Sequence, residues 1–139
     1  MRKLAVLALG LVVVLLGGCS FLFPKGSVYI TVDTIGATLN VVEFIPPGAN
    51  AGSYPNEYSS YAATVNVAGY TWYEYEIRKG EYDAYIEWSG GIGFNGRTRI
   101  YVDPRSTDNQ WVGVYADTGG NVWAETGGGT FDPPLSMYP

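Results

Sequence analysis

The sequence predicts an all-β fold, a small antiparallel β-sandwich of about seven or eight strands preceded by an N-terminal apolar signal segment. Three observations support this prediction. The chain has 139 residues, which is the length of one domain. Residues 24–139 show no sustained 3.6-residue period of the kind that marks an amphipathic helix. Short alternating runs bounded by Gly, Pro, Asn and Asp recur instead, which is typical of antiparallel β domains.

The strands can be placed in order along the chain. Val28, Ile30 and Val32 alternate with more polar residues and mark the first strand. The second strand is Thr38–Ile45, and the Pro46-Pro47-Gly48 turn ends it. The remaining predicted strands are 62–67, 70–77, 82–88, 98–103, 111–116 and 121–125.

The domain organisation follows from these elements. We expect a signal peptide over residues 1–18, a short tether over 19–27, the β-sandwich over 28–126 and a tail rich in Gly and Pro over 127–139. The tail begins with three consecutive glycines, so we expect it to be loose.

A tight hairpin is predicted at Lys79-Gly80, because glycine supplies the positive φ that such a turn needs. With Arg78 opposite Glu81, the apolar side chains of both strands share one face, which is predicted to be the core face. They are Tyr73, Tyr75, Ile77, Tyr82, Ala84, Ile86 and Trp88. The opposite face is acidic and aromatic and makes up the candidate ligand-binding set: Tyr70, Trp72, Glu74, Glu76, Asp83, Tyr85 and Glu87.

The next strand is predicted to lie beside residues 82–88, with Ile100 and Val102 turned to the core. Arg99 then falls on the acidic face, where we expect it opposite Glu87.

The N-terminus carries an export signal. Arg2 and Lys3 precede an uncharged run that extends from Leu4 to Leu16, as in a secretory signal peptide. The sequence Leu16-Gly17-Gly18-Cys19 that follows resembles the lipobox of bacterial lipoproteins. That resemblance implies cleavage before Cys19 and a diacylglyceryl group on its sulfur, with the domain held outside the cytoplasm on a membrane. Ser20 resembles the residue that permits transport onward to the outer membrane in Gram-negative bacteria.

An uncleaved membrane-spanning helix is the alternative. The uncharged stretch of residues 4–23 is about 20 residues long, enough to span a bilayer. The glycines at its centre favour the lipoprotein interpretation. Both alternatives place residues 24–139 outside the cytoplasm, because Arg2 and Lys3 stay inside.

The composition excludes several functions. There is no histidine, so imidazole general bases and the Ser-His-Asp triad are absent. The only cysteine is Cys19, which leaves no intrachain disulfide. Without residues 1–18 the chain has six basic and thirteen acidic residues, a net charge of −7. This acidity argues against nucleic acid as a partner.

Carboxylate catalysis is the enzymatic route that remains open. Glu74 and Glu76 would lie about 7 Å apart on one strand face, a spacing that glycoside hydrolysis permits. Alternating acids on an exposed strand are more often a solvated surface, and the mature chain is short for a walled cleft. We therefore expect a protein that binds rather than catalyses.

A calcium site is a further hypothesis, because Ca²⁺ prefers carboxylate, amide and carbonyl oxygens. Its candidates are Asp103, Asp108 and Asp117, which lie in two predicted loops. The alternative is that these residues stabilise turns through their own backbone hydrogen bonds. No other cofactor is expected.

The aromatic content leaves two ligand classes open. The 12 tyrosines and 4 tryptophans exceed what a small core needs. Aromatic rings beside acids suit carbohydrate binding, whereas aromatic patches also mark contacts between proteins. We expect an envelope protein or a polysaccharide as the partner, with the first favoured.

The body of the chain carries one further likeness. The segment from Ile77 to Ile86, with Gly80 followed by Tyr82, resembles the turn of transthyretin-like and carboxypeptidase-regulatory-like sandwich modules. Those modules are usually non-catalytic, and the resemblance implies the same sandwich class here.

Overall fold

A computed structural model describes residues 24–32, 37–54, 58, 60–67, 69–89, 93–106, 108, 110–117 and 119–133. These residues form an all-β domain of eight strands, as the sequence predicts. The strands are β1 (Lys25–Val32), β2 (Thr38–Ile45), β3 (Ala63–Val67), β4 (Tyr70–Arg78), β5 (Gly80–Ser89), β6 (Gly93–Val102), β7 (Trp111–Ala116) and β8 (Val122–Gly127).

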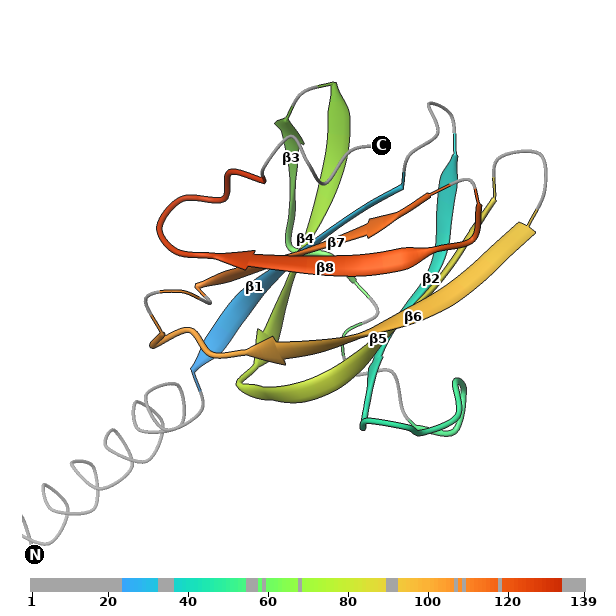
Figure 1. The fold of residues 1–139 in the computed structure, drawn as a ribbon, viewed down its shortest axis with the longest axis horizontal. Coiled ribbons are helices and arrows are strands. Elements are labelled where there is room, and N and C mark those ends of the chain that lie inside the picture. The colour runs from blue at the N-terminus through green and yellow to red at the C-terminus, as the bar shows by residue number, and fades with distance from the viewer. Residues whose placement is uncertain are drawn as a thin grey trace, which may run out of the picture.

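The strands build two sheets that pack face to face as a β-sandwich (Figure 1). Sheet A has five strands in the order β3-β4-β1-β7-β8, and sheet B has three in the order β2-β5-β6. The pairing of β1 with β7 is parallel, while the other pairs are antiparallel. The parallel pair departs from the predicted antiparallel sandwich.

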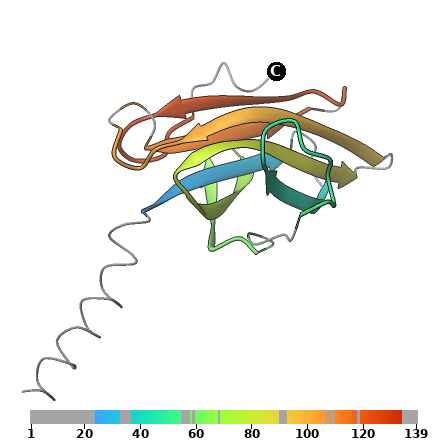
Figure 2. The same ribbon diagram turned by 90° about the horizontal axis from the view of Figure 1, so that it is seen from below.

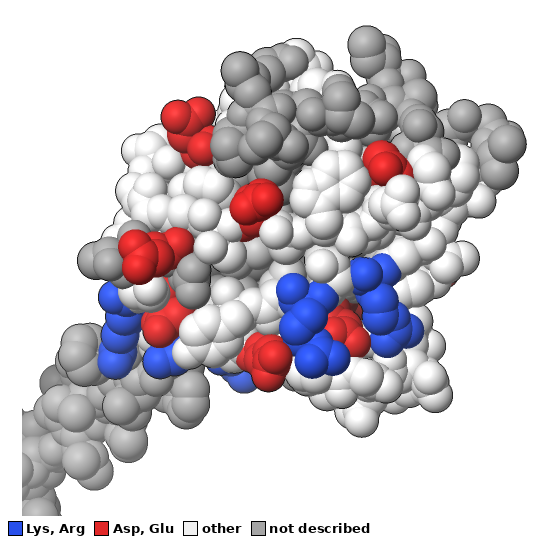
Figure 3. Space-filling model, in the orientation of Figure 1, with Lys and Arg blue, Asp and Glu red and all other residues white. Residues whose placement is uncertain are grey.

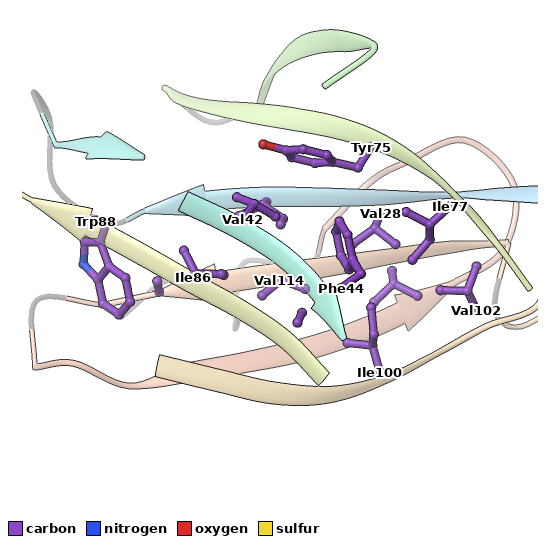
Figure 4. Packing of buried hydrophobic residues seen from close by; sticks show 14 residues of the cluster. Val28, Val42, Phe44, Tyr75, Ile77, Ile86, Trp88, Ile100, Val102 and Val114 are labelled. Carbon is purple, nitrogen blue, oxygen red and sulfur yellow. The ribbon is translucent and has the colours of Figure 1, made fainter. Parts of the chain in front are cut away.

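The core lies between the sheets, because apolar residues alternate inward along the strands. Val28 and Ile30 of β1 and Val112 and Val114 of β7 are buried on the sheet A side. Sheet B contributes inward residues that include Val42, Phe44, Ala84, Ile86, Trp88, Ile100 and Val102. Figure 4 shows Trp88 at one end of this core and Ile77 and Val102 at the other.

The predicted strands correspond closely to the observed ones. The bounds of β2 and β7 are those predicted from the alternation and the turn residues. The others shift by one to five residues. β1 begins at Lys25, so three residues assigned to the tether belong to the sheet.

The predicted hairpin at Lys79-Gly80 is wrong. Within the described residues no backbone pairing joins β4 to β5: β4 pairs with β1 and β3, and β5 pairs with β2 and β6. Gly80 has a φ of 158°, near the extended conformation, and opens β5 rather than a tight turn. The N–H of Lys79 donates to Pro24 O at 3.3 Å, and the chain passes from sheet A to sheet B.

The prediction failed because a hairpin and a sheet-to-sheet crossing have the same side-chain alternation. In both, Ile77 and Tyr82 turn to the core on either side of the bend. The inward residues were therefore predicted correctly, with Tyr75, Ala84 and Ile86 among the buried ones. Only the strands' hydrogen-bonding partners were wrong.

The tail was also predicted wrongly where the structure describes it. Residues 128–133 return across the outer face of sheet A, and Phe131 stacks on Tyr29 with ring centroids 3.8 Å apart. Pro133 is buried.

The lipobox and Cys19 lie outside the described residues, as do the tether residues 19–23 and the tail beyond residue 133. In the part of the chain that is described, no helix has the length and apolarity to span a membrane.

Candidate functional site

The seven candidate ligand-binding residues do not share one face. Those on β4, which are Tyr70, Trp72, Glu74 and Glu76, belong to sheet A. Those on β5, which are Asp83, Tyr85 and Glu87, belong to sheet B. Both groups point away from the shared core, so the crossing at Lys79-Gly80 puts them on opposite outer surfaces of the sandwich. The single acidic and aromatic face predicted from the hairpin does not form.

On the outer face of sheet A, Trp72 is buried rather than available to a ligand. It packs with Tyr115 in a second hydrophobic cluster, to which Tyr29, Val67, Tyr70, Trp123 and Phe131 also contribute. The ring of Phe131 lies 5.0 Å from that of Trp72 and 5.1 Å from that of Trp111, edge-to-face in both cases. The tail therefore covers this face with an aromatic side chain.

A glycine makes this covering possible. Gly127 ends β8 opposite Trp111, and a Cβ at this position would overlap the Trp111 indole. The absent side chain lets the indole lie against the backbone of the neighbouring strand, next to Phe131.

Glu74 and Glu76 have different surroundings. The Glu74 carboxylate accepts hydrogen bonds from the Ser27 hydroxyl at 2.8 Å and the Tyr29 hydroxyl at 3.2 Å. Burial and the Glu74 charge together raise the pKa of Tyr29. Glu76 is exposed. Glu74 thus acts locally by tying β4 to β1.

On the outer face of sheet B, Asp83 is the centre of an ion-pair network. Its side chain is 5% exposed. One carboxylate oxygen accepts from Arg99 Nε at 2.6 Å, and the other accepts from the N–H of Gly48 at 2.9 Å and lies 3.5 Å from Arg97 Nη1. Burial would raise the pKa of Asp83, but the hydrogen bonds from Arg99 and Gly48 outweigh it and hold the pKa below its usual value.

This network fastens the 46–53 loop to sheet B. Arg97 Nη1 donates to Ala49 O at 2.6 Å, and the N–H of Gly52 donates to Glu43 Oε2 at 2.9 Å. Arg99 was predicted opposite Glu87, but the β5–β6 register places it opposite Asp83.

Tyr85 and Glu87 form a local pair on the same face. The Tyr85 hydroxyl donates to Glu87 Oε1 at 2.7 Å, which raises the pKa of Tyr85. The guanidinium carbon of Arg97 lies 5.8 Å from the Tyr85 ring centroid, within the range of a cation–π interaction.

The three calcium candidates lie in two connections, and Asp117 is in the one between β7 and β8. The Asp117 carboxylate accepts from the backbone N–H groups of Gly119 and Asn121, both at 2.9 Å. Burial by itself would raise the pKa of Asp117, but the hydrogen bonds from Asn121 and Gly119 outweigh it and hold the pKa below its usual value. Among the described residues, no group of three or more acids or cysteines is placed to hold a metal ion.

The other two candidates lie in the connection after β6. Asp103 accepts from the N–H of Arg105 at 3.1 Å and lies 3.6 Å from Lys79 Nζ. Asp108 is exposed, and its N–H donates to the Ser106 hydroxyl at 3.3 Å. These contacts are those of turn residues, the alternative considered for all three.

A tyrosine-lined groove, which sequence reasoning missed, opens between β2 and β4. Its cavity measures about 350 Å³, and β2 lines it with residues from Thr38 to Val42. Tyr61, Tyr73 and Tyr75 form the other wall; the Tyr61 ring lies 5.0 Å from Tyr73 and 6.4 Å from Tyr75. The Tyr61 side chain is 52% exposed. Burial, with the neighbouring Tyr61 and Tyr73, raises the pKa of Tyr75 to about 12.

The groove exists because sheet B is narrower than sheet A. β2 is the edge strand of sheet B, so the inward tyrosines of β4 are only partly covered by it. Tyr73 and Tyr75 were assigned to the core face from their alternation. A run of tyrosines at inward positions is a signal that the face is partly open to water, because the hydroxyl needs a polar neighbour.

No protein-family model, no curated protein and no solved structure matches the chain.

Proposed function

We propose that the chain is a lipid-anchored module of the bacterial envelope, which holds a binding domain at a membrane and does not catalyse. The observation that carries the proposal is the short distance between the lipobox and the domain. Cys19 precedes Pro24 by five residues, which span at most about 18 Å when extended. β1 starts at the next residue, Lys25. An acylated Cys19 would hold that end of the sandwich against the lipid headgroups.

The anchor would also orient the domain. Lys25 pairs with Arg78 at one end of sheet A, and Tyr73 lies five residues away along β4, or about 17 Å. The tyrosine-lined groove, which includes Thr38 at the far end of β2, is therefore turned away from the anchored end. That arrangement suits a protein that presents a ligand site to the space beyond the membrane.

Mass spectrometry of the protein expressed from its full sequence in a bacterium tests the anchor. We expect a mature N-terminus at Cys19 carrying a diacylglyceryl group, and recovery of the protein in the membrane fraction. Cys19→Ser should abolish acylation and leave the signal segment attached, while Ser20→Ala serves as the matched control and is processed normally. An unmodified Cys19 in a chain that begins at Met1 would refute the proposal.

Carbohydrate binding in the tyrosine-lined groove is the second candidate function. It is favoured by the exposed Tyr61 ring and by the side chains of Thr38 and Asn40 along the same cavity. Aromatic faces contact the C–H surfaces of sugars, and hydroxyl and amide groups hydrogen-bond their hydroxyls. The cavity of about 350 Å³ falls in the size range of small-molecule sites.

A glycan array followed by calorimetry tests this candidate. Tyr61→Ala should abolish binding of any polysaccharide fragment that the wild type retains. Tyr54→Ala is the matched control, because Tyr54 is exposed to the same degree, 51% against 52%, and does not line the groove. Equal loss in both variants, or binding that survives Tyr61→Ala, would exclude the groove as a sugar site. A wild type that binds no glycan but co-purifies with an envelope protein would favour the protein partner.

A further inference from the structure

The basic residues of the domain are concentrated at the end where β1 begins. After residue 18 the chain has six Lys and Arg residues. Four of them, Lys25, Arg78, Lys79 and Arg105, lie at this end, since Lys25 pairs with Arg78 and the N–H of Lys79 donates to Pro24 O. Figures 1 and 2 show β1 entering the domain at this extremity, and in Figure 3 the Lys and Arg side chains are spread across the lower half of the view, with Asp and Glu side chains among them.

Three of these cations and two tyrosines surround one hollow. A cavity of about 620 Å³ is lined by Pro24, Arg78, Lys79, Gly80, Tyr82, Tyr101 and Arg105. The Tyr82 hydroxyl donates to Arg78 O at 2.8 Å, and Tyr101 is 46% exposed. Tyrosine is enriched where proteins meet lipid headgroups, because its ring is apolar and its hydroxyl is polar.

The lining of the hollow carries three cations and no acid, whereas the mature chain has a net charge of −7. Two acids lie in the connection that also carries Arg105: Asp103, which lies 3.6 Å from Lys79 Nζ, and exposed Asp108. Exposed Glu76, which lies opposite Ser27, and exposed Glu81, which lies opposite Tyr101, are near this end as well. The four acids balance the four cations of the end as a whole, and the positive charge is confined to the lining of the hollow. Arg97 and Arg99 lie on the outer face of sheet B, where both contact Asp83 and Arg99 also lies 3.7 Å from Glu81.

We propose that this basic hollow docks on the anionic phospholipid headgroups of the membrane that holds the chain, and so fixes the orientation of the domain. The inference rests on the proposed function, because the 18 Å reach from Cys19 is what brings Pro24 to the membrane surface. Phosphate groups would lie among Arg78, Lys79 and Arg105, while the acidic remainder of the domain is repelled from the same surface. Attraction and repulsion therefore select one orientation.

Hydrogen exchange of the whole chain reconstituted in vesicles tests the docking. One vesicle preparation is pure phosphatidylcholine, and the other contains one third phosphatidylglycerol. The attraction of one Lys or Arg side chain to an anionic leaflet shifts a binding equilibrium about fivefold. We expect the amides of residues 78–81 and of Asp103, Arg105 and Ser106 to exchange at least about fivefold more slowly on the anionic vesicles. This difference should vanish at about 1 M salt, where the Debye length is only about 3 Å. Equal exchange on both preparations would overturn the proposal.

Charge variants locate the effect. Arg105→Glu should remove most of the protection on anionic vesicles, while Arg105→Lys should retain it. The matched control is the double variant Thr38→Glu/Asn95→Glu, which changes the net charge by the same two units at exposed positions near the opposite end. If the control loses as much protection as Arg105→Glu, the effect comes from total charge, and the basic hollow is not a docking surface.

The same samples separate failure of the docking from failure of the anchor. Flotation with the vesicles and the mass of the Cys19 peptide report on the anchor alone. If the chain is acylated and floats with the vesicles, but its exchange rates are the same on both preparations, only the docking is refuted. A chain that floats with neither preparation refutes both proposals.

Discussion

The two outer faces of the sandwich are covered by the chain itself, but with opposite chemistry. The outer face of sheet A carries Trp72 and Tyr115 and is covered by residues 128–133 through Phe131. The outer face of sheet B carries Asp83 and its arginines and is covered by the 46–53 loop. Strand alternation alone marks both faces as solvent-exposed.

The comparison shows that the chemistry of each outer face is set by the segment of chain that packs on it. Aromatic packing stabilises the outer face of sheet A by removing apolar area from water, and this contribution does not depend on pH. The Asp83 network stabilises the outer face of sheet B through charge-assisted hydrogen bonds, and this contribution is lost when the carboxylate is protonated. The two faces should therefore respond differently to truncation, acid and salt.

The largest expected effect is at the aromatic face. Trp72→Ala removes a side chain that is 0% exposed, so we expect the free energy of unfolding to fall by about 3–5 kcal/mol. Chemical denaturation measures it, with Tyr54→Ala as an exposed control that should change stability by less than about 0.5 kcal/mol. A loss below about 1 kcal/mol for Trp72→Ala would mean that the tail does not cover the indole.

Phe131→Ala tests the covering segment itself. The half-buried ring stacks on Tyr29 and meets Trp72 and Trp111, so its removal should lower the free energy of unfolding by about 2 kcal/mol. Phe131→Leu keeps apolar volume without the stacking and should cost roughly half as much. Tryptophan emission should shift to longer wavelength in the alanine variant alone; an unchanged spectrum would argue against the contact.

Asp83→Asn should cost less, about 1–2 kcal/mol, because half-exposed Arg97 and Arg99 regain water when the network breaks. The folded pKa of Asp83 lies below the unfolded value of about 3.9, so its contribution is complete above that value and is lost as the pH falls through the folded pKa. Stability between neutral pH and about pH 2 should therefore fall less steeply in Asp83→Asn than in the wild type. Asp108→Asn, at an exposed turn, is the control, and an identical pH profile for all three proteins would contradict the role of Asp83.

The smallest effect is expected at the second attachment of the 46–53 loop. Glu43→Gln weakens one exposed hydrogen bond to the Gly52 N–H and should cost about 0.5 kcal/mol. The Gly52 amide should exchange faster while the Gly48 amide, held by Asp83, keeps its protection. Equal acceleration at both amides would show that the loop opens as one unit from sheet B.

Much of the fold followed from local patterns. The bounds of Thr38–Ile45 and Trp111–Ala116 were predicted from alternation and turn residues, and the inward positions of Tyr75, Ile86 and Ile100 from their parity. These features depend on neighbours in the chain, so one sequence contains them. The Leu16–Cys19 segment that resembles a lipobox is likewise continuous in the sequence, and the proposed function is based on that resemblance.

The candidate site was less predictable, because its residues come from segments far apart in the sequence. Phe131 reaches Trp72 across 59 positions, and Tyr61 meets an edge strand that ends at Ile45. Nothing in the pattern around Trp72 distinguishes a tryptophan exposed to ligand from one covered by the tail.

By itself, the sequence determined the strands, their inward faces, the charge balance and the expected location of the protein in the cell. Only the tertiary structure decided that the chain crosses between sheets at Lys79-Gly80, which outer face the tail covers, and that the basic residues gather where β1 begins. The reason is that side-chain alternation is a property of a single strand. The choice of a partner strand depends on which distant backbone groups can hydrogen-bond while the whole core is buried.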